Sequence, residues 1–151
     1  MAAAPYVAVV GPGEESPASE AAEAVGRELA RRGAVVVCGG RGGAMAAACR
    51  GAASEGGVSV GLLPGTDRSE ANEWVTVAVA TGLGELRNGL VVRAADAVIA
   101  VAGGPGTLSE IAFALKTGRP VVGLETWEIE GVVAAADPAD AVERALAATV
   151  S

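Results

Sequence analysis

The chain has no histidine, and several other residue types are scarce: 151 residues include one lysine, two cysteines and 3% aromatic residues. The absence of histidine excludes serine–histidine–aspartate and cysteine–histidine catalysis, and it excludes every histidine-based metal site. Two cysteines do not make a zinc site either. We therefore expect no metal and no resident cofactor, and any acid–base chemistry would use Glu or Asp carboxylates.

Positive charge is also scarce, since the formal net charge is −7. A general nucleic-acid binder normally needs a basic face, so this balance argues against one. The sequence has no apolar run of membrane-spanning length, and residues 1–5 lack the basic region of a secretory signal. We expect a cytoplasmic protein with no membrane and no nucleic-acid partner.

The chain is rich in small apolar residues: the hydrophobic fraction is 51%, and few of these residues are aromatic. The core must then consist mainly of Ala, Val, Leu and Ile, which permits close contact between helices and a sheet. The length fits one domain over residues 1–151. These properties favour a layered α/β fold.

Predicted strands and helices alternate along the whole chain. We expect a Rossmann-like, doubly wound three-layer sandwich with a mainly parallel sheet and right-handed crossovers, in strand order 3-2-1-4-5 or close to it. Ser16 or Ser19 is expected to cap the first helix. The expected strands cover residues 6–10, 34–38, 58–63, 74–79, 97–101 and 120–124. The first expected helix ends near Arg32. The later helices cover about 44–55, 85–95, a segment including 111–115, and 138–149.

Three glycine-rich turns follow strand ends, at residues 11–13, 39–43 and 103–106. A single such turn is often only a tight turn, but three at carboxyl ends should meet at one edge of a doubly wound sheet, where ligands bind. The third turn also leads into a helix N-terminus, which favours an anion. We predict a phosphorylated small-molecule ligand held by Gly11, Gly13, Gly39, Gly40, Arg41, Gly103, Gly104, Gly106 and Thr107.

Two common nucleotide sites are disfavoured by the same turns. The dinucleotide pattern Gly-x-Gly-x-x-Gly is not met, because Gly11-Pro12-Gly13 is followed by Glu14-Glu15-Ser16. No ribose-binding acid ends the second strand, and the Gly-x-x-x-x-Gly-Lys-Ser/Thr pattern is absent.

Two charged residues are candidates for chemistry. Arg87 is either a solvated arginine or faces Glu110 across the crevice, with its guanidinium available to a phosphate or a leaving group. Glu110 lies about one helical turn after Thr107. A carboxylate so close to a phosphate indicates a ribose or a reacting centre beside it.

The two cysteines are Cys38, at an expected strand end, and Cys49, within an expected helix. We expect them to be reduced thiols in or near the core, with a disulfide or a thiol nucleophile as the alternative.

The segment Gly103-Gly104-Pro105-Gly106-Thr107-Leu108-Ser109-Glu110 resembles the Gly-Gly-x-Gly-Thr-x-x-Glu motif of the Lonely-guy and "lysine decarboxylase-like" superfamily. Residues 39–45 resemble its second-strand signature, and residues 84–88 resemble its arginine motif. The resemblance extends from Tyr6 to Leu124. It is closest to a short bacterial subgroup that is similar to molybdenum-cofactor carrier proteins.

This resemblance implies a Rossmann-like homodimer or higher homo-oligomer that binds a nucleoside 5′-monophosphate. It further implies a phosphoribohydrolase that releases free base and ribose 5-phosphate, with the glycines and Thr107 on the phosphate and with Glu110 and Arg87 in catalytic roles. Lysine decarboxylation is not expected, since the only lysine, Lys116, lies alone in a predicted helix.

The sequence departs from the hydrolase pattern at two positions. Phe113 stands where those enzymes have a second acidic residue, and Asn88 stands where many have a lysine. The alternative is a non-catalytic carrier or sensor of a phosphorylated heterocycle such as the molybdenum cofactor. A third possibility is a structural dimer that has lost its ligand.

Overall fold

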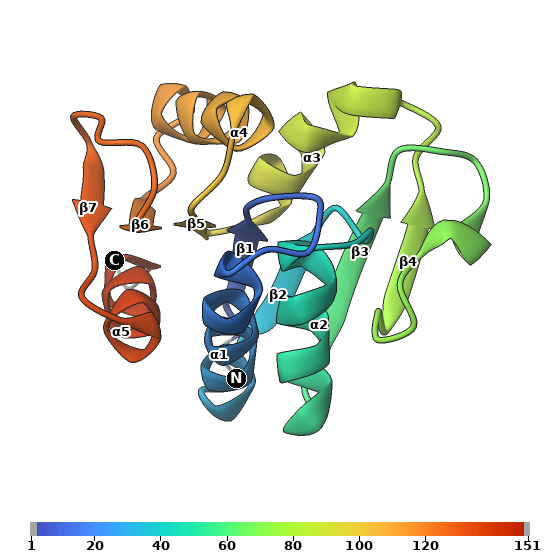
Figure 1. Ribbon diagram of the computed structural model, residues 1–151, viewed down its shortest axis with the longest axis horizontal. Helices are drawn as coiled ribbons and strands as arrows, with labels where there is room; N and C mark the ends of the chain where they lie inside the picture. Colours follow the sequence, from blue (N-terminus) through green and yellow to red (C-terminus); the bar gives the residue numbers. More distant parts are fainter. Residues whose placement is uncertain (1–2, 150–151) are drawn as a thin grey trace.

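The computed structural model describes residues 3–149, in which strands and helices alternate (Figure 1). The strands are β1 (Tyr6–Val10), β2 (Val35–Cys38), β3 (Ser59–Leu63), β4 (Val77–Ala80), β5 (Ala97–Val101), β6 (Val121–Leu124) and β7 (Val132–Ala134). The helices are α1 (Ala18–Arg31), α2 (Ala44–Ser54), α3 (Arg87–Ala94), α4 (Pro105–Lys116) and α5 (Pro138–Thr149), with 3-10 turns η1 (Arg68–Glu70) and η2 (Gly84–Leu86).

The strands form one parallel sheet in the order β4-β3-β2-β1-β5-β6-β7, which confirms the predicted doubly wound, Rossmann-like fold. The predicted order placed the fourth strand beside the first, and this was wrong. The fourth strand pairs with β3 at an edge, with Val60 beside Val77, and β5 lies beside β1. The reason is burial: Val77 and Val79 are 47% and 41% exposed, as an edge strand tolerates, whereas every residue of β5 is buried.

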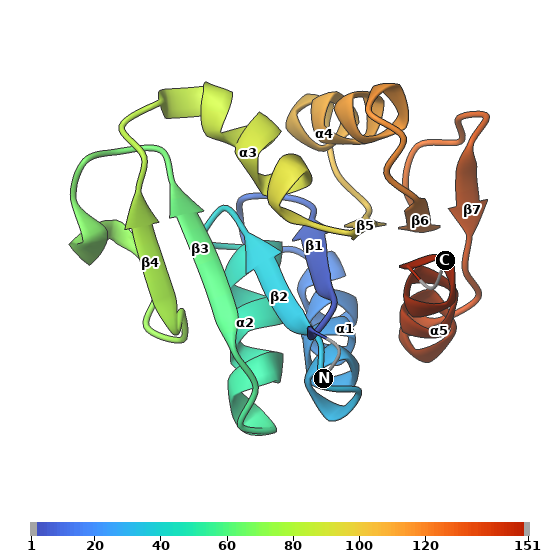
Figure 2. The same ribbon diagram turned by 180° about the vertical axis from the view of Figure 1, so that it is seen from behind.

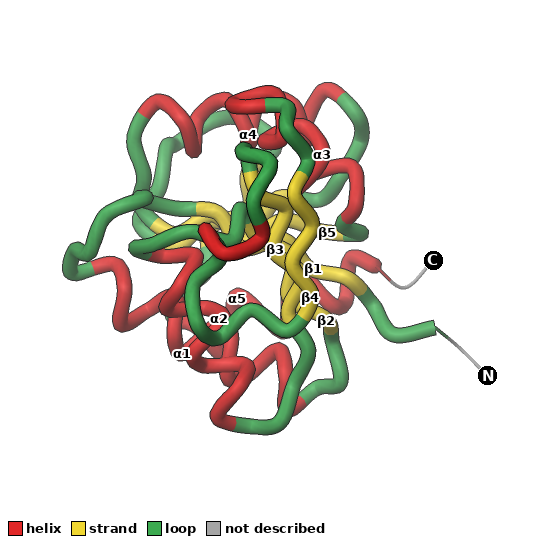
Figure 3. The backbone as a smooth tube through the Cα atoms, turned by 90° about the vertical axis from the view of Figure 1, so that its right-hand side faces the viewer, coloured by secondary structure: helices red, strands yellow, loops and turns green. Residues whose placement is uncertain are grey.

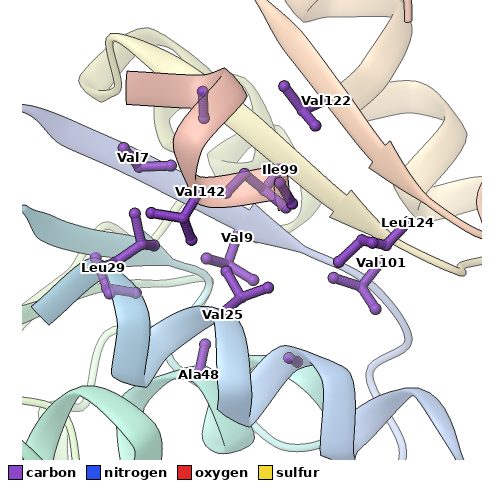
Figure 4. Close-up of a cluster of buried hydrophobic side chains, with 14 of the residues drawn as sticks. Val7, Val9, Val25, Leu29, Ala48, Ile99, Val101, Val122, Leu124 and Val142 are labelled. Atoms are coloured by element: carbon purple, nitrogen blue, oxygen red, sulfur yellow. The ribbon is translucent and has the colours of Figure 1, made fainter. Parts of the chain in front are cut away.

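Helices cover both faces of the sheet. Helices α1, α2 and α5 lie on one face, and α3 and α4 lie on the other (Figures 1 and 2). Seen from the side, the strands run between the two helical layers (Figure 3). Figure 4 shows the larger cluster, in which Val25 and Leu29 of α1 and Val142 of α5 pack on Val9 and Ile99. Aliphatic side chains dominate this core, as predicted.

The contact between α1 and α2 depends on two glycines. A Cβ atom on Gly26 would overlap the carbonyl oxygen of Ala48, and one on Gly51 would overlap the carbonyl oxygen of Glu23. The backbones of the two helices therefore touch directly, and no side chain separates them at this point.

Some local predictions were wrong in detail. The residue before α1 is Pro17, and no side chain caps the helix there, although the Ser16 hydroxyl accepts a hydrogen bond from the Ala18 amide at 3.2 Å. The helix expected from residue 85 begins as η2 and becomes α-helical at Arg87. Strand β7 was not predicted, because three residues with an exposed Val133 carry little periodic signal. None of the helices within residues 3–149 has the length and apolar character to cross a membrane.

Candidate functional site

The three glycine-rich turns meet at the carboxyl edge of the sheet, as predicted. The Ala44 amide, after the second turn, donates to the Pro12 carbonyl of the first turn at 2.9 Å. Gly11 lies against the end of β5, so that a Cβ there would come within 2.7 Å of the Val101 carbonyl oxygen. The turns therefore surround the switch point between β1 and β5, where the sheet reverses its winding.

The chain itself fills the space around the turn at residues 39–43. Gly40 has a φ of 78°, and a Cβ on Gly43 would overlap the Pro12 carbonyl oxygen. Asn72 anchors this turn, since its backbone amide donates to the Gly40 carbonyl at 2.9 Å and its side chain donates to the Arg41 carbonyl at 2.9 Å. The Arg41 side chain remains exposed, with a loose ion pair of 3.5 Å to Glu70.

The turn after β5 is different, because two of its three glycines have free space. A Cβ on Gly104 or Gly106 would meet nothing within 4 Å, and neither residue has a positive φ. Neither glycine is therefore required by the protein's own packing. Both begin α4 at a point where a ligand could approach the backbone closely.

Gly103 in the same turn has a structural role. Its φ is 106°, and a Cβ there would overlap the Thr107 side chain, which is 3% exposed. Thr107 thus packs beneath the turn, and its role as a hydroxyl donor to a ligand stays a prediction.

Two residues that the sequence analysis did not assign to the site hold this turn from the end of β6. The Thr126 hydroxyl donates to the Ala102 carbonyl at 2.6 Å, and the Trp127 indole N–H donates to the Gly104 carbonyl at 3.3 Å. Ala102 has a φ of 48°, unusual for a residue with a side chain. The position of residues 126–127 after a strand end was the one signal that could have indicated them.

Arg87 begins α3, and its guanidinium lies against the second turn. A Cβ on Gly39 would be 2.7 Å from the Arg87 Cζ atom. The side chain is half-buried and donates to the neighbouring Asn88 carboxamide, while its Nε–H is buried with no hydrogen-bond partner. No carboxylate within residues 3–149 forms a salt bridge with Arg87. The Arg87 side chain is therefore not freely solvated, and its contact with a ligand stays a prediction.

Glu110 lies in the electrostatic field of Arg87, one turn into α4. Burial raises the pKa of Glu110 to about 7, and the positive charge of Arg87 opposes that rise. Burial likewise lowers the pKa of Arg87, and Glu110 opposes that shift. The two groups sense each other without forming a salt bridge, so each remains available to a third group.

Phe113 occupies the position of the second acid in the hydrolase motif. Its ring lies between α3 and α4, where a Cβ on Gly89 would be 3.8 Å from Cε2. It packs against the core on this face of the sheet. An apolar contact between helices therefore replaces a carboxylate that could activate water.

A cavity of about 720 Å³ lies on the other side of the first turn, beneath the N-terminal ends of α1 and α5. Its wall includes Pro12 and Ala102 together with the acidic residues Glu20, Glu125 and Asp137, and it contains no arginine or lysine. This cavity differs in charge from the region around Arg87, and no sequence pattern predicted it.

Comparison with known proteins places this geometry in a family. Residues 4–149 match the SLOG cluster4 family. An uncharacterised protein of Archaeoglobus fulgidus is 38% identical over 146 residues, which cover 95% of this chain and 96% of that protein.

Two solved structures are similar over almost their entire length. The molybdenum cofactor binding protein of Rippkaea orientalis is 34% identical with a TM-score of 0.92, covering 97% of this chain and 98% of that one. The molybdenum cofactor carrier protein of Chlamydomonas reinhardtii is 31% identical with a TM-score of 0.90, covering 99% and 100%. These likenesses confirm the predicted resemblance to the short subgroup related to molybdenum-cofactor carriers. The chain belongs to the SLOG cluster4 family.

Proposed function

We propose that this protein binds a phosphorylated heterocycle of the molybdenum-cofactor type and carries it without chemical turnover. The observation that carries the proposal is the Arg87 guanidinium, which is half-buried beside the glycine turns with an unpartnered Nε–H and no salt bridge within residues 3–149. A buried donor without an acceptor costs about 1–3 kcal/mol. A phosphate oxygen would remove that cost and compensate the charge.

The open turn at the start of α4 supplies the second half of a phosphate site. The first amides of a helix have no partners within the helix, and its N-terminus carries about half a positive charge. Gly104 and Gly106 leave room for an anion at these amides. Glu110 is compatible with that anion when protonated, because a neutral carboxyl group donates a hydrogen bond to phosphate or to a hydroxyl group.

Absence of turnover is supported by Phe113 and by the similar proteins. The Rippkaea orientalis protein is a molybdenum cofactor binding protein, and the Chlamydomonas reinhardtii protein is a molybdenum cofactor carrier. With Phe113 in place of a second acid, one carboxylate would have to serve every proton transfer.

The test is retention of a pterin during purification. The wild-type protein, produced in cells that make the molybdenum cofactor, should carry a pterin that fluoresces after oxidation. R87A should retain at least about tenfold less, because a charge-assisted hydrogen bond contributes about 1.5–3 kcal/mol. R93A is the matched control, since Arg93 is an exposed arginine on the same helix. Equal retention by R87A and wild type would contradict the proposal.

A phosphoribohydrolase is the second candidate function. One observation favours it: a pKa of about 7 allows Glu110 to exchange a proton near neutral pH. The carrier proposal expects no free base from any common nucleoside 5′-monophosphate, as measured by chromatography. Base release by wild type that E110Q abolishes would favour the enzyme instead.

We also propose that two copies associate through the surface beside Arg87. Leu83, Leu86 and Leu90 are exposed there, and Leu86 is 77% exposed. Such a patch on η2 and α3 is typical of a self-complementary interface. Sedimentation should show a dimer that L86E dissociates, and a monomeric wild type at micromolar concentration would contradict this.

A further inference from the structure

Within residues 3–149, the buried nucleophilic groups that the proposed function leaves unused include a pair of cysteines in contact. Cys38 ends β2, and Cys49 lies in α2. Their Sγ atoms are 3.4 Å apart, both side chains are fully buried, and both thiols are free. The predicted placement of both cysteines in the core is thus confirmed, and the two sulfurs are in direct contact.

We propose that Cys38 and Cys49 are an oxidative modification site, which closes to an intramolecular disulfide when the protein meets a hydroperoxide. Closure requires the sulfurs to approach from 3.4 Å to the disulfide length of about 2.05 Å. The two residues come from a strand end and from the helix packed on it.

The two thiols have unequal roles. The hydrogen bond between the two thiols lowers the pKa of Cys49 to about 7, burial opposes that shift, and hydrogen bonds with Ser59 and Asn72 lower the pKa further. The same contact, together with burial, raises the pKa of Cys38. We therefore assign Cys49 as the nucleophile and Cys38 as the resolving thiol.

The reaction proceeds in two balanced steps. The Cys49 thiolate attacks one oxygen of hydrogen peroxide, breaks the O–O bond and becomes a sulfenic acid, while the released hydroxide takes a proton to form water. Cys38 then attacks the Cys49 sulfur, and the sulfenic oxygen leaves as a second water. Two thiols and one peroxide give one disulfide and two waters.

The disulfide would form directly beneath the second glycine turn. The Gly40 amide donates to the Cys38 Sγ at 3.4 Å, and Asn72, which bonds to the Gly40 carbonyl, also contacts Cys49. Movement of the Cys38 sulfur toward Cys49 therefore alters an anchor of the turn against which Arg87 lies.

The primary test needs no variant. Reduced full-length protein is treated with hydrogen peroxide, alkylated in denaturant and digested with trypsin, which cleaves after Arg32, Arg41 and Arg50. The expected product is residues 33–41 joined to residues 42–50 by a disulfide that dithiothreitol reverses. The Gly39 and Gly40 amide resonances should shift with oxidation and return with reduction. Thiols that stay fully alkylatable, or disulfides only between molecules, would overturn the proposal.

Two single variants assign the roles. C38S should leave a Cys49 sulfenic acid that dimedone traps, whereas C49S should react with peroxide and dimedone far more slowly. The opposite result would overturn the assignment of Cys49 as nucleophile. Circular dichroism of each variant establishes that it is folded before the comparison, and the linked peptide in wild type remains decisive if a variant does not fold.

Discussion

The turn at residues 39–43 and the turn at residues 103–106 look alike in sequence but differ in what surrounds their glycines. In the first, a Cβ on Gly43 would overlap backbone atoms, and a Cβ on Gly39 or Gly40 would come within 3 Å of side-chain atoms. In the second, Gly104 and Gly106 face open space. A glycine that neither packing nor a positive φ requires leaves room for a ligand to approach the backbone closely.

The strongest test of this contrast is Gly43→Ala. The new Cβ would overlap the Pro12 carbonyl oxygen, at a φ of 60° that disfavours alanine. We expect the free energy of unfolding to fall by about 2–5 kcal/mol from strain and overpacking. Urea denaturation measures it, and a loss below about 1 kcal/mol would mean that the two turns are packed alike.

The second test concerns the charge beside the open turn. The pKa of Glu110 is about 7 when folded against an ordinary 4.5, so the unfolded chain binds fewer protons between those values. Stability should therefore fall as pH rises from about 4.5 to about 7, by an amount on the order of 1–3 kcal/mol. E110Q should remove most of this slope and be more stable than wild type above pH 7. The same slope in E110Q would assign the effect to other groups.

A smaller effect is expected from Thr126→Val, which removes the hydroxyl that holds Ala102. Loss of this hydrogen bond should cost about 1 kcal/mol. The Ala102–Gly104 amides should also exchange hydrogen faster, while those of residues 39–43 stay unchanged. Equal acceleration in both turns would show that they are not held independently.

The smallest effect on stability is expected for Gly104→Ala. Its Cβ would touch nothing in the protein, so unfolding should change by less than about 0.5 kcal/mol. Pterin retention should nevertheless fall markedly, because the methyl group would occupy the approach to the α4 amides. Unchanged retention with unchanged stability would remove this turn from the proposed site.

Much of this architecture follows from local sequence. Alternating apolar runs and glycine breaks predicted the parallel fold, and the convergence of the turns followed from parallel strands ending at one edge. The position of β4 did not follow, because its exposure at the edge depends on its neighbours rather than on its own residues. The hydrogen bonds from Thr126 and Trp127 and the contact between Cys38 and Cys49 were not predictable either. They join segments whose distance depends on how helices pack.

The side-chain-free contact at Gly26 and Gly51 has a mechanical consequence for the edge of the sheet. Helices α1 and α2 cannot slide or separate without breaking their direct backbone contact, so the two turns that precede them should move as one rigid unit. Helices α3 and α4 lie on the other face of the sheet, carry Arg87 and Glu110, and contact each other through side chains such as Phe113. We therefore expect α3 and α4, and not α1 and α2, to shift when a ligand of different size binds.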